Sequence, residues 1–230
     1  MTPQLNDLQK NIGIKFKDPA ILEQALIHRS YINENKALKL ESNERYEFLG
    51  DAVLELWASA KLFHLFPQYP EGDLTNLRSM AVRTENLADI SKLINLSDYI
   101  KLSKGEETHG GRQNVSILAD GFESVIGAIY LDSGMVAVDQ FLTKFLEPSI
   151  QNLSQQKIYK DPKSLFQEIA QAKQGITPNY KVISESGPDH QKIFEVGVYI
   201  GDKLITTGSG NSKQRAEEDA ATKATQLSQV

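Results

Sequence analysis

The spacing of the apolar residues changes near residue 152, and this change constrains the fold more than any other feature. Across residues 1–150, apolar side chains recur every three or four positions, beginning with Leu5, Leu8 and Ile12, and strand-like alternation is nearly absent. Short clusters of Gly, Pro and Asp separate the periodic segments. The sequence therefore predicts an all-helical domain over the first two thirds of the chain.

The last third of the chain follows a different pattern. One helical segment over 162–174 precedes runs in which apolar and polar residues alternate, and such runs are typical of half-buried strands. A final segment over 212–226 places several alanines on one helical face. These observations predict an α-β-β-β-α order, with strands near 180–183, 193–200 and 203–208.

A polar stretch over residues 152–160 lies between these two patterns and contains neither Gly nor Pro. We interpret this stretch as a linker. We therefore expect one domain over residues 1–151 and a second over residues 161–230. A chain of 230 residues is long enough to form two such cores.

Composition narrows the possible classes of protein. The formal net charge of −5 gives no sign of a globally basic nucleic-acid binder. Residues 157–230 carry 10 basic and 9 acidic side chains. Residues 1–156 carry the other 15 basic and 21 acidic side chains, so the acidic excess lies in this part of the chain. The absence of cysteine excludes a disulfide, a thiolate metal site and a Cys nucleophile. With no secretion signal and no apolar run of about 18 residues, we expect a cytoplasmic protein without a membrane partner.

Two predicted helices carry carboxylates among apolar residues. At about 100° per residue, Glu44, Glu47 and Asp51 fall on one stripe of the first helix. Asp120 and Glu123 share a stripe on the second. The neighbouring residues are mostly large and apolar, which predicts that both helices are buried. Because an ionised carboxylate removed from water is costly unless it is compensated, we expect a bound cation beside these acids.

The chemistry of these two segments favours magnesium. Mg²⁺ prefers oxygen ligands, whereas neither segment contains the Cys or His that zinc would favour. A di-metal bundle of the ferritin type requires Glu-x-x-His on two helices, and neither segment has that pattern. Magnesium held by carboxylates is typical of phosphate chemistry, so phosphodiester hydrolysis is the leading interpretation.

Several motifs resemble those of the ribonuclease III family and occur in the same order. Residues 43–54 are similar to the family's signature, and residues 116–132 are similar to its second catalytic block. Shorter matching blocks lie at 25–31, 70–74, 102–107 and 110–112. On these motifs the chain is identified as a member of that family over nearly its whole length.

This resemblance implies a magnesium-dependent endonuclease that cleaves double-stranded RNA and leaves 5′-phosphate and 3′-hydroxyl ends with a short 3′ overhang. By position, Glu47, Asp120 and Glu123 match the family's metal ligands, with manganese as a substitute ion and no small-molecule cofactor. Asp51 and Glu123 match its catalytic acids. Ribosomal RNA precursors and other structured transcripts are the expected substrates.

Three further positions match supporting residues of the family. Glu44 and Glu71 match auxiliary acids of the cleavage region. Phe48 matches an aromatic residue that inserts into the partner subunit, so the resemblance implies a homodimer; from periodicity alone, Phe48 is equally an ordinary core residue. One nuclease domain per chain also favours a dimer, because two symmetric sites can face the two RNA strands.

The second domain resembles a double-stranded RNA-binding domain, which recognises A-form RNA through 2′-hydroxyls and phosphates. Ser164, Gln167 and His190 match the positions that contact the minor groove. Lys213, Gln214 and Arg215 open the final helix, whose N-terminal turn favours an anion. A second basic residue is common at position 214 and a third at position 217, so we expect modest phosphate affinity. The matching residues are Ser164, Gln167, His190, Lys213, Gln214 and Arg215.

The sequence is also compatible with two alternative functions. The same fold is compatible with a non-cleaving double-stranded RNA-binding or ribosome-associated factor, although all the expected acids are present. A DNA-directed nuclease is less favoured, because the second domain resembles one that depends on 2′-hydroxyls. His28, His64 and His109 have no visible partner typical of acid–base catalysis, so we interpret them as structural or surface residues. Neither Ser30 nor Ser116 lies in a nucleophile elbow, so we set covalent catalysis aside.

Overall fold

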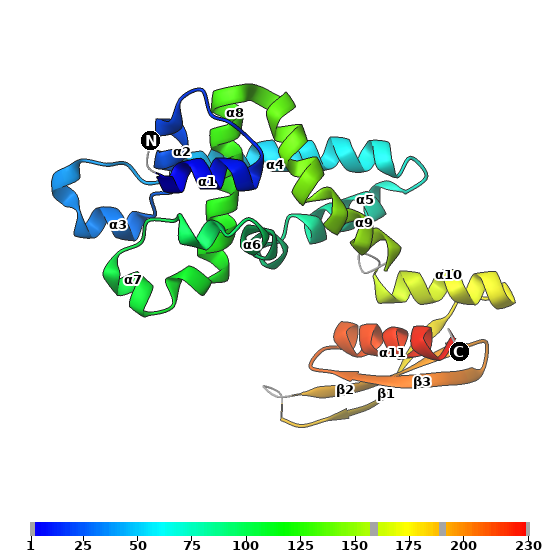
Figure 1. The fold of residues 1–230 in the computed structure, drawn as a ribbon. Helices are drawn as coiled ribbons and strands as arrows, with labels where there is room; N and C mark the ends of the chain where they lie inside the picture. Colours follow the sequence, from blue (N-terminus) through cyan, green and yellow to red (C-terminus); the bar gives the residue numbers. More distant parts are fainter. Residues whose placement is uncertain (1–2, 157–160, 189–191, 229–230) are drawn as a thin grey trace. The chain divides into compact units, whose positions relative to one another are not determined.

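The computed structural model describes residues 3–156, 161–188 and 192–228, and the chain divides into two compact units (Figure 1). The first unit ends at Tyr159 and the second begins at Lys160. In the described part of the first unit, the only β-type pairing is an isolated bridge between Ile27 and Lys101, so the predicted all-helical domain is confirmed.

Nine α-helices and three short 3₁₀ segments form the described part of the first unit. The elements are α1 (Pro3–Ile12), α2 (Pro19–Ala25), α3 (Arg29–Glu34), η1 (Lys36–Leu38), α4 (Glu44–Leu65), α5 (Glu71–Ala81), α6 (Thr84–Leu93), η2 (Leu96–Asp98), α7 (Lys104–Thr108), η3 (Gly111–Gln113), α8 (Val115–Phe145) and α9 (Glu147–Gln155).

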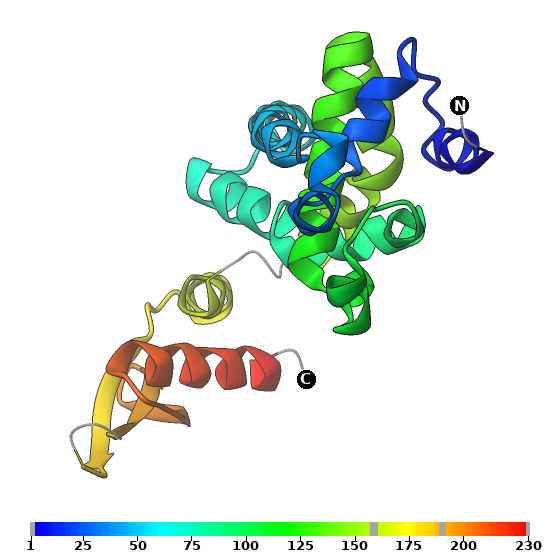
Figure 2. The same cartoon turned by 90° about the vertical axis from the view of Figure 1, so that its left-hand side faces the viewer.

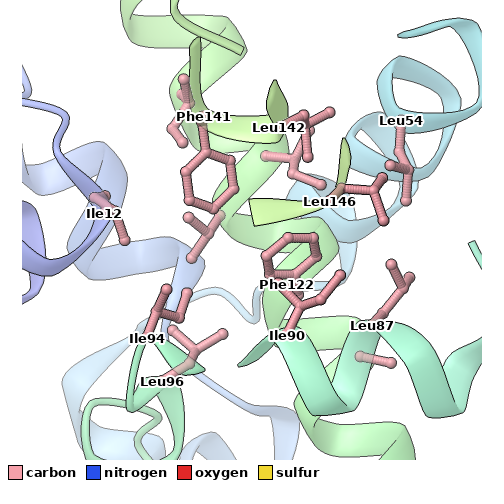
Figure 3. Packing of buried hydrophobic residues seen from close by; sticks show 14 of the residues in the cluster. Ile12, Leu54, Leu87, Ile90, Ile94, Leu96, Phe122, Phe141, Leu142 and Leu146 are labelled. Carbon is pink, nitrogen blue, oxygen red and sulfur yellow. The ribbon is translucent and has the colours of Figure 1, made fainter. Parts of the chain in front are cut away.

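The long helix α8 is the centre of the first unit and packs against α4, α6 and α2. Its Phe122 and Phe141 are buried, with ring centroids 5.4 Å apart. Figure 3 shows α6 side chains, including Leu87 and Ile90, directed toward Phe122. By length and composition alone α8 could cross a membrane, but fourteen of its residues are buried in the described part of the chain, as in the core helix of a helical domain.

The last helix of this unit corrects the predicted start of the linker. We expected a linker from residue 152, but α9 continues to Gln155. The physical reason is burial: Leu153 belongs to the core cluster, and the hydroxyls of Ser154 and Tyr69 lie 2.9 Å apart in a hydrogen bond. The polar composition of the segment concealed these contacts. The remainder of the predicted linker, residues 157–160, lies outside the described residues.

The second unit has the predicted α-β-β-β-α order. Its three strands form one antiparallel sheet in the order β1-β2-β3, and in Figures 1 and 2 both helices lie on one face of this sheet. Phe166, Ala170 and Val198 are buried between the helices and the sheet. The elements are α10 (Pro162–Gln174), β1 (Asn179–Ser186), β2 (Ile193–Ile200), β3 (Lys203–Gly210) and α11 (Lys213–Ser228).

Asp132 ties the loop between α1 and α2 to α8. Its carboxylate accepts hydrogen bonds from the backbone N–H of Asp18 at 2.8 Å, that of Lys17 at 3.1 Å and the hydroxyl of Ser133 at 2.6 Å. Burial alone would raise the pKa of Asp132, but these hydrogen bonds outweigh it and hold the pKa below its usual value. The ionised carboxylate is therefore the form that holds the loop.

We expect Asp132→Asn to lower the free energy of unfolding by about 1 kcal/mol at pH 7, because an amide NH₂ would face a backbone N–H. A depressed pKa stabilises the fold above the unfolded-state value, near 4, and this contribution disappears as the pH falls through the folded-state pKa. Urea unfolding should therefore show a difference at pH 7 that shrinks toward pH 3. Asp89→Asn, at an exposed residue paired with Lys92, is the control; an equal loss in both variants would contradict the prediction.

Candidate active site

The acids predicted on two helices meet where α4 and α8 cross. Glu47 lies in the first turn of α4, and Asp120 and Glu123 lie in the N-terminal half of α8. One carboxylate oxygen from each of these three residues lies within 4.8 Å of the other two. The 3.6-residue helical period places each set on one face, and the helix crossing brings the two faces together.

Two glycines make this crossing possible. A Cβ atom on Gly50 of α4 would lie 1.8 Å from the backbone carbonyl oxygen of Glu123. A Cβ on Gly127 of α8 would lie 2.2 Å from the carbonyl oxygen of Tyr46. Because no other residue lets the backbones approach so closely, these glycines offset their poor helix propensity with direct backbone contact. The apolar periodicity did not predict this role, although a Gly in the interior of each acid-bearing helix is a signal for it.

Burial and mutual repulsion raise the pKa values of the clustered acids. Burial has the largest effect on Glu123, followed by the charges of Asp51 and Asp120, and its pKa is raised to about 8. Burial and the negative charges of Asp120 and Glu44 raise the pKa of Glu47. Burial also raises the pKa of Asp120. The cluster therefore contains more negative charge than its surroundings compensate.

This donor set fits a hard divalent cation. It consists of three carboxylates, with neither thiolate nor imidazole among them. A cation at this position would stabilise the ionised carboxylates and so oppose the burial that raises all three pKa values. Oxygen-only ligation is characteristic of Mg²⁺, Mn²⁺ and Ca²⁺. Glu47, Asp120 and Glu123 are thus the residues that could hold a metal ion.

Asp51 and Glu44 lie beside this trio rather than in it. Asp51 is exposed, and its charge is the largest coulombic influence on Glu123. Glu44 is also exposed; it accepts a hydrogen bond from the hydroxyl of Ser42 at 2.8 Å, and its carboxylate lies 3.8 Å from the guanidinium of Arg29. The carboxylates of Asp51 and Glu44 are therefore accessible to a water molecule or a substrate group next to the trio.

Glu71 is not brought to this cluster within one chain. It is the first residue of α5, after the C-terminal end of the 22-residue helix α4. Arg78 of α5 pairs with Glu55 at 3.0 Å, so α5 runs back along α4 and begins near its far end. At 1.5 Å per residue, roughly 27 Å of helix separates Glu47 from Leu65.

A cavity of about 610 Å³ opens next to the acids. Glu44, Glu47, Glu106 and Asp120 supply the carboxylates of its lining. The rest of its lining is mostly polar and includes groups from α3 and from the first turn of α8. These lining residues include His28, Arg29, Ser30, Asn33, Asn114 and Ser116. His28, predicted to be a structural or surface residue, and Ser30 thus border the cavity next to the acidic cluster.

The residues expected to contact RNA in the second unit lie on α10 and at the start of α11. Ser164, Gln167 and Gln214 line a cavity of about 500 Å³. Lys213 and Arg215 are exposed in the first turn of α11, where Lys213 lies 3.6 Å from Glu185. This pairing offsets part of its charge. His190 lies outside the described residues.

Comparison with known proteins identifies both units. A model described as ribonuclease-III-like matches residues 18–150, and a double-stranded RNA binding motif matches residues 162–227. Ribonuclease 3 from Carboxydothermus hydrogenoformans is 46% identical over 223 residues, which cover 97% of this chain and 95% of that protein. The chain belongs to the ribonuclease III family. The predicted family and its two-domain order are therefore confirmed.

Further ribonuclease III relatives agree with this assignment. Ribonuclease 3 from Streptococcus equi subsp. zooepidemicus is also 46% identical, over 97% of both chains. A crystal structure of the nuclease domain of ribonuclease III from Campylobacter jejuni superposes with a TM-score of 0.59 at 37% identity, covering 64% of this chain and 97% of that one. A second structure of that domain superposes with a TM-score of 0.58 at 38% identity, covering 63% of this chain and 96% of that one. That structure is described as flexible in a region involved in dimer formation.

Proposed function

We propose that this ribonuclease III family member is an endoribonuclease that hydrolyses phosphodiesters in double-stranded RNA, including ribosomal RNA precursors. The observation that carries this function is the carboxylate trio at the crossing of α4 and α8, in a chain that also carries a double-stranded RNA binding motif. We further propose that the nuclease domain extends to the end of α9 at Gln155, that residues 161–230 form the RNA-binding domain, and that the protein acts in the cytoplasm.

The proposed mechanism assigns a role to each acid of the cluster. Glu47, Asp120 and Glu123 would hold magnesium, or manganese in its place. The ion, when bound, would lower the pKa of water and stabilise negative charge on the leaving oxygen. The exposed carboxylate of Asp51, beside Glu123, orients the attacking water and accepts its proton. Attack on phosphorus breaks the bond to the 3′ oxygen, so the products carry a 5′-phosphate and, after protonation, a 3′-hydroxyl.

Cleavage of a labelled RNA hairpin in magnesium tests this function, with the same hairpin made of DNA beside it. We expect cuts in the RNA alone, with short 3′ overhangs and dependence on the metal ion. Binding without cleavage in any divalent metal would instead favour the alternative, a non-cleaving double-stranded RNA-binding or ribosome-associated factor. Cleavage of the DNA hairpin would contradict selection through 2′-hydroxyls.

Metal affinity should depend strongly on pH. The pKa of Glu123 is raised to about 8 in the metal-free protein, so metal binding near pH 7 must displace a proton from this carboxyl. We expect the apparent Kd for Mn²⁺ to fall up to about tenfold per unit between pH 6 and 8 and to level off above pH 8. Calorimetric titration in buffers of different ionisation enthalpy measures the Kd and the released proton. A Kd independent of pH would contradict this role for Glu123.

We propose that two chains form the active enzyme. Phe48 on α4 is 79% exposed, and other large apolar side chains of α4 and α8, including Leu56, Leu131 and Val136, are also exposed. Exposed apolar side chains on two helices that pack together are candidates for an interface. In a symmetric dimer, Phe48 inserts into the partner subunit. Because Glu71 lies far from its own chain's cluster, its proposed auxiliary role requires the second protomer.

Phe48→Glu should shift the protein from dimer to monomer, because a charge would be buried at the interface. Light scattering at micromolar concentration measures the change, and we expect an increase in the dimer Kd of at least about 100-fold, as expected for several kcal/mol of lost binding. Leu93→Glu, at a residue 72% exposed on α6, is the matched control. A monomeric parent protein would refute the dimer itself.

The six RNA-binding positions of the second domain are part of the same proposal. Ser164 and Gln167, with His190 outside the described residues, would contact minor-groove hydroxyls. Lys213 and Arg215, with Gln214 between them, would contact phosphates at the N-terminal turn of α11. This binding would hold the duplex for cleavage by the nuclease domain.

A further inference from the structure

The ring of His28 has a fixed orientation at the edge of the acidic cavity. His28 is the residue before α3 and caps its N-terminus, because its Nδ1 accepts a hydrogen bond from the backbone N–H of Ser30 at 3.3 Å. The same Nδ1 lies 2.8 Å from the hydroxyl oxygen of Ser30. Both contacts hold the Nδ1 side of the imidazole against the start of α3.

Ser30 determines which nitrogen of His28 carries the proton. The hydroxyl oxygen of Ser30 accepts a hydrogen bond from the backbone N–H of Ser103 at 3.0 Å, which leaves its own hydrogen available for Nδ1. Nδ1 is therefore an acceptor, so the proton of the neutral imidazole is on Nε2. Burial lowers the pKa of His28, with Glu106 acting in the opposite direction, and the neutral form predominates at pH 7.

The Nε2–H group is a donor without an acceptor among the described residues, where the hydrogen bonds of the His28 ring all involve Nδ1. His28 lines the 610 Å³ cavity together with Glu47 and Asp120. Arg29 and Ser116 line the same cavity and add further donors. A phosphate held at the acidic side of this cavity would thus face hydrogen-bond donors from α3 and α8.

We propose that the Nε2–H of His28 donates a hydrogen bond to a non-bridging phosphate oxygen of the RNA strand at the cleavage site. This inference rests on the proposed nuclease function and adds a substrate-contacting residue to it. A phosphate oxygen is the acceptor that the chemistry favours, because RNA presents such oxygens wherever its backbone approaches the acids. Ser30 is then a positioning residue that acts through the tautomer of His28.

Two substitutions separate the donor from the helix cap. In His28→Asn, the side-chain oxygen can still accept from the N–H of Ser30, since Asn is a favoured N-cap, but no donor remains at the Nε2 position. In His28→Gln, the amide nitrogen can reach the position of Nε2. We expect His28→Asn to have the same melting temperature as the parent protein. Its cleavage rate should be roughly 10- to 100-fold lower, as expected for a lost hydrogen bond to a charged group. We expect His28→Gln to regain most of that rate.

Phosphorothioate substitution at the scissile phosphate identifies the contact itself. Sulfur accepts hydrogen bonds poorly, so replacing the contacted oxygen should slow the parent enzyme but should add little to the defect of His28→Asn. His64→Asn, at the last turn of α4, is the control and should show the parent's response. Equal sulfur effects in parent and His28→Asn, or parent-like cleavage by His28→Asn, would overturn the proposal. No cleavage by the parent protein would instead refute the nuclease function.

Discussion

Glu123→Gln should abolish cleavage and at the same time stabilise the metal-free protein. The amide keeps the shape of the side chain but removes one carboxylate from the proposed metal-binding trio. We expect the cleavage rate to fall by roughly 10³-fold or more, since a metal ligand and a catalytic carboxylate are lost together. Binding of uncut RNA should be nearly unchanged, because the second domain is intact.

The gain in stability follows from the direction of the pKa shift. A carboxyl whose folded-state pKa is raised to about 8 destabilises the fold progressively as the pH rises from near 4.5 to 8. At pH 7 Glu123→Gln removes this penalty, and we expect a gain of roughly 2 kcal/mol that nearly disappears at pH 4.5. Denaturant unfolding with a chelator at both pH values measures it. Glu85→Gln, at an exposed helix start, is the control, and a loss of stability at pH 7 would refute the electrostatic account.

Gly50→Ala should have the largest effect on folding. Helix propensity alone favours Ala by about 1 kcal/mol, but the new Cβ would lie 1.8 Å from the carbonyl oxygen of Glu123. Neither backbone can yield locally, so the two helices must separate. We expect the free energy of unfolding to fall by roughly 3 kcal/mol or more, together with the metal affinity of the trio. Thermal unfolding and Mn²⁺ titration measure the two losses.

Gly72→Ala is the matched control for this prediction. Gly72 also lies within a helix, α5, but a Cβ there would have nothing within 4 Å. The same chemical change should therefore be neutral or stabilising by up to about 1 kcal/mol. If Gly50→Ala behaved like Gly72→Ala, close backbone contact would not be what holds the acids together.

The sequence predicted the domain order because helix and strand periods differ and are local properties. It also placed Glu47 with Asp51 and Asp120 with Glu123, since residues three or four apart share a helical face. It could not show which faces meet. That depends on Gly50 and Gly127, whose neighbours across the crossing are more than seventy positions away in the sequence.

Two other features could not be predicted from local pattern. Asn152 to Gln155 are helical because Leu153 and Ser154 pack against distant residues, although their composition is that of a linker. The environment of His28 depends on Ser103, which lies 75 positions later in the sequence and fixes the hydroxyl of Ser30. In each case a tertiary contact, and not propensity, decides the outcome.

The glycine contact between α4 and α8 also has a consequence for the choice of ion. The carboxylates project from two helices whose backbones already touch at Gly50 and Gly127, so these two backbones cannot move apart without breaking the core. A larger ion such as Ca²⁺ requires longer ligand distances and more ligands than Mg²⁺ does. In the proposed metal site, selection against larger ions would therefore originate in two residues that have no side chain.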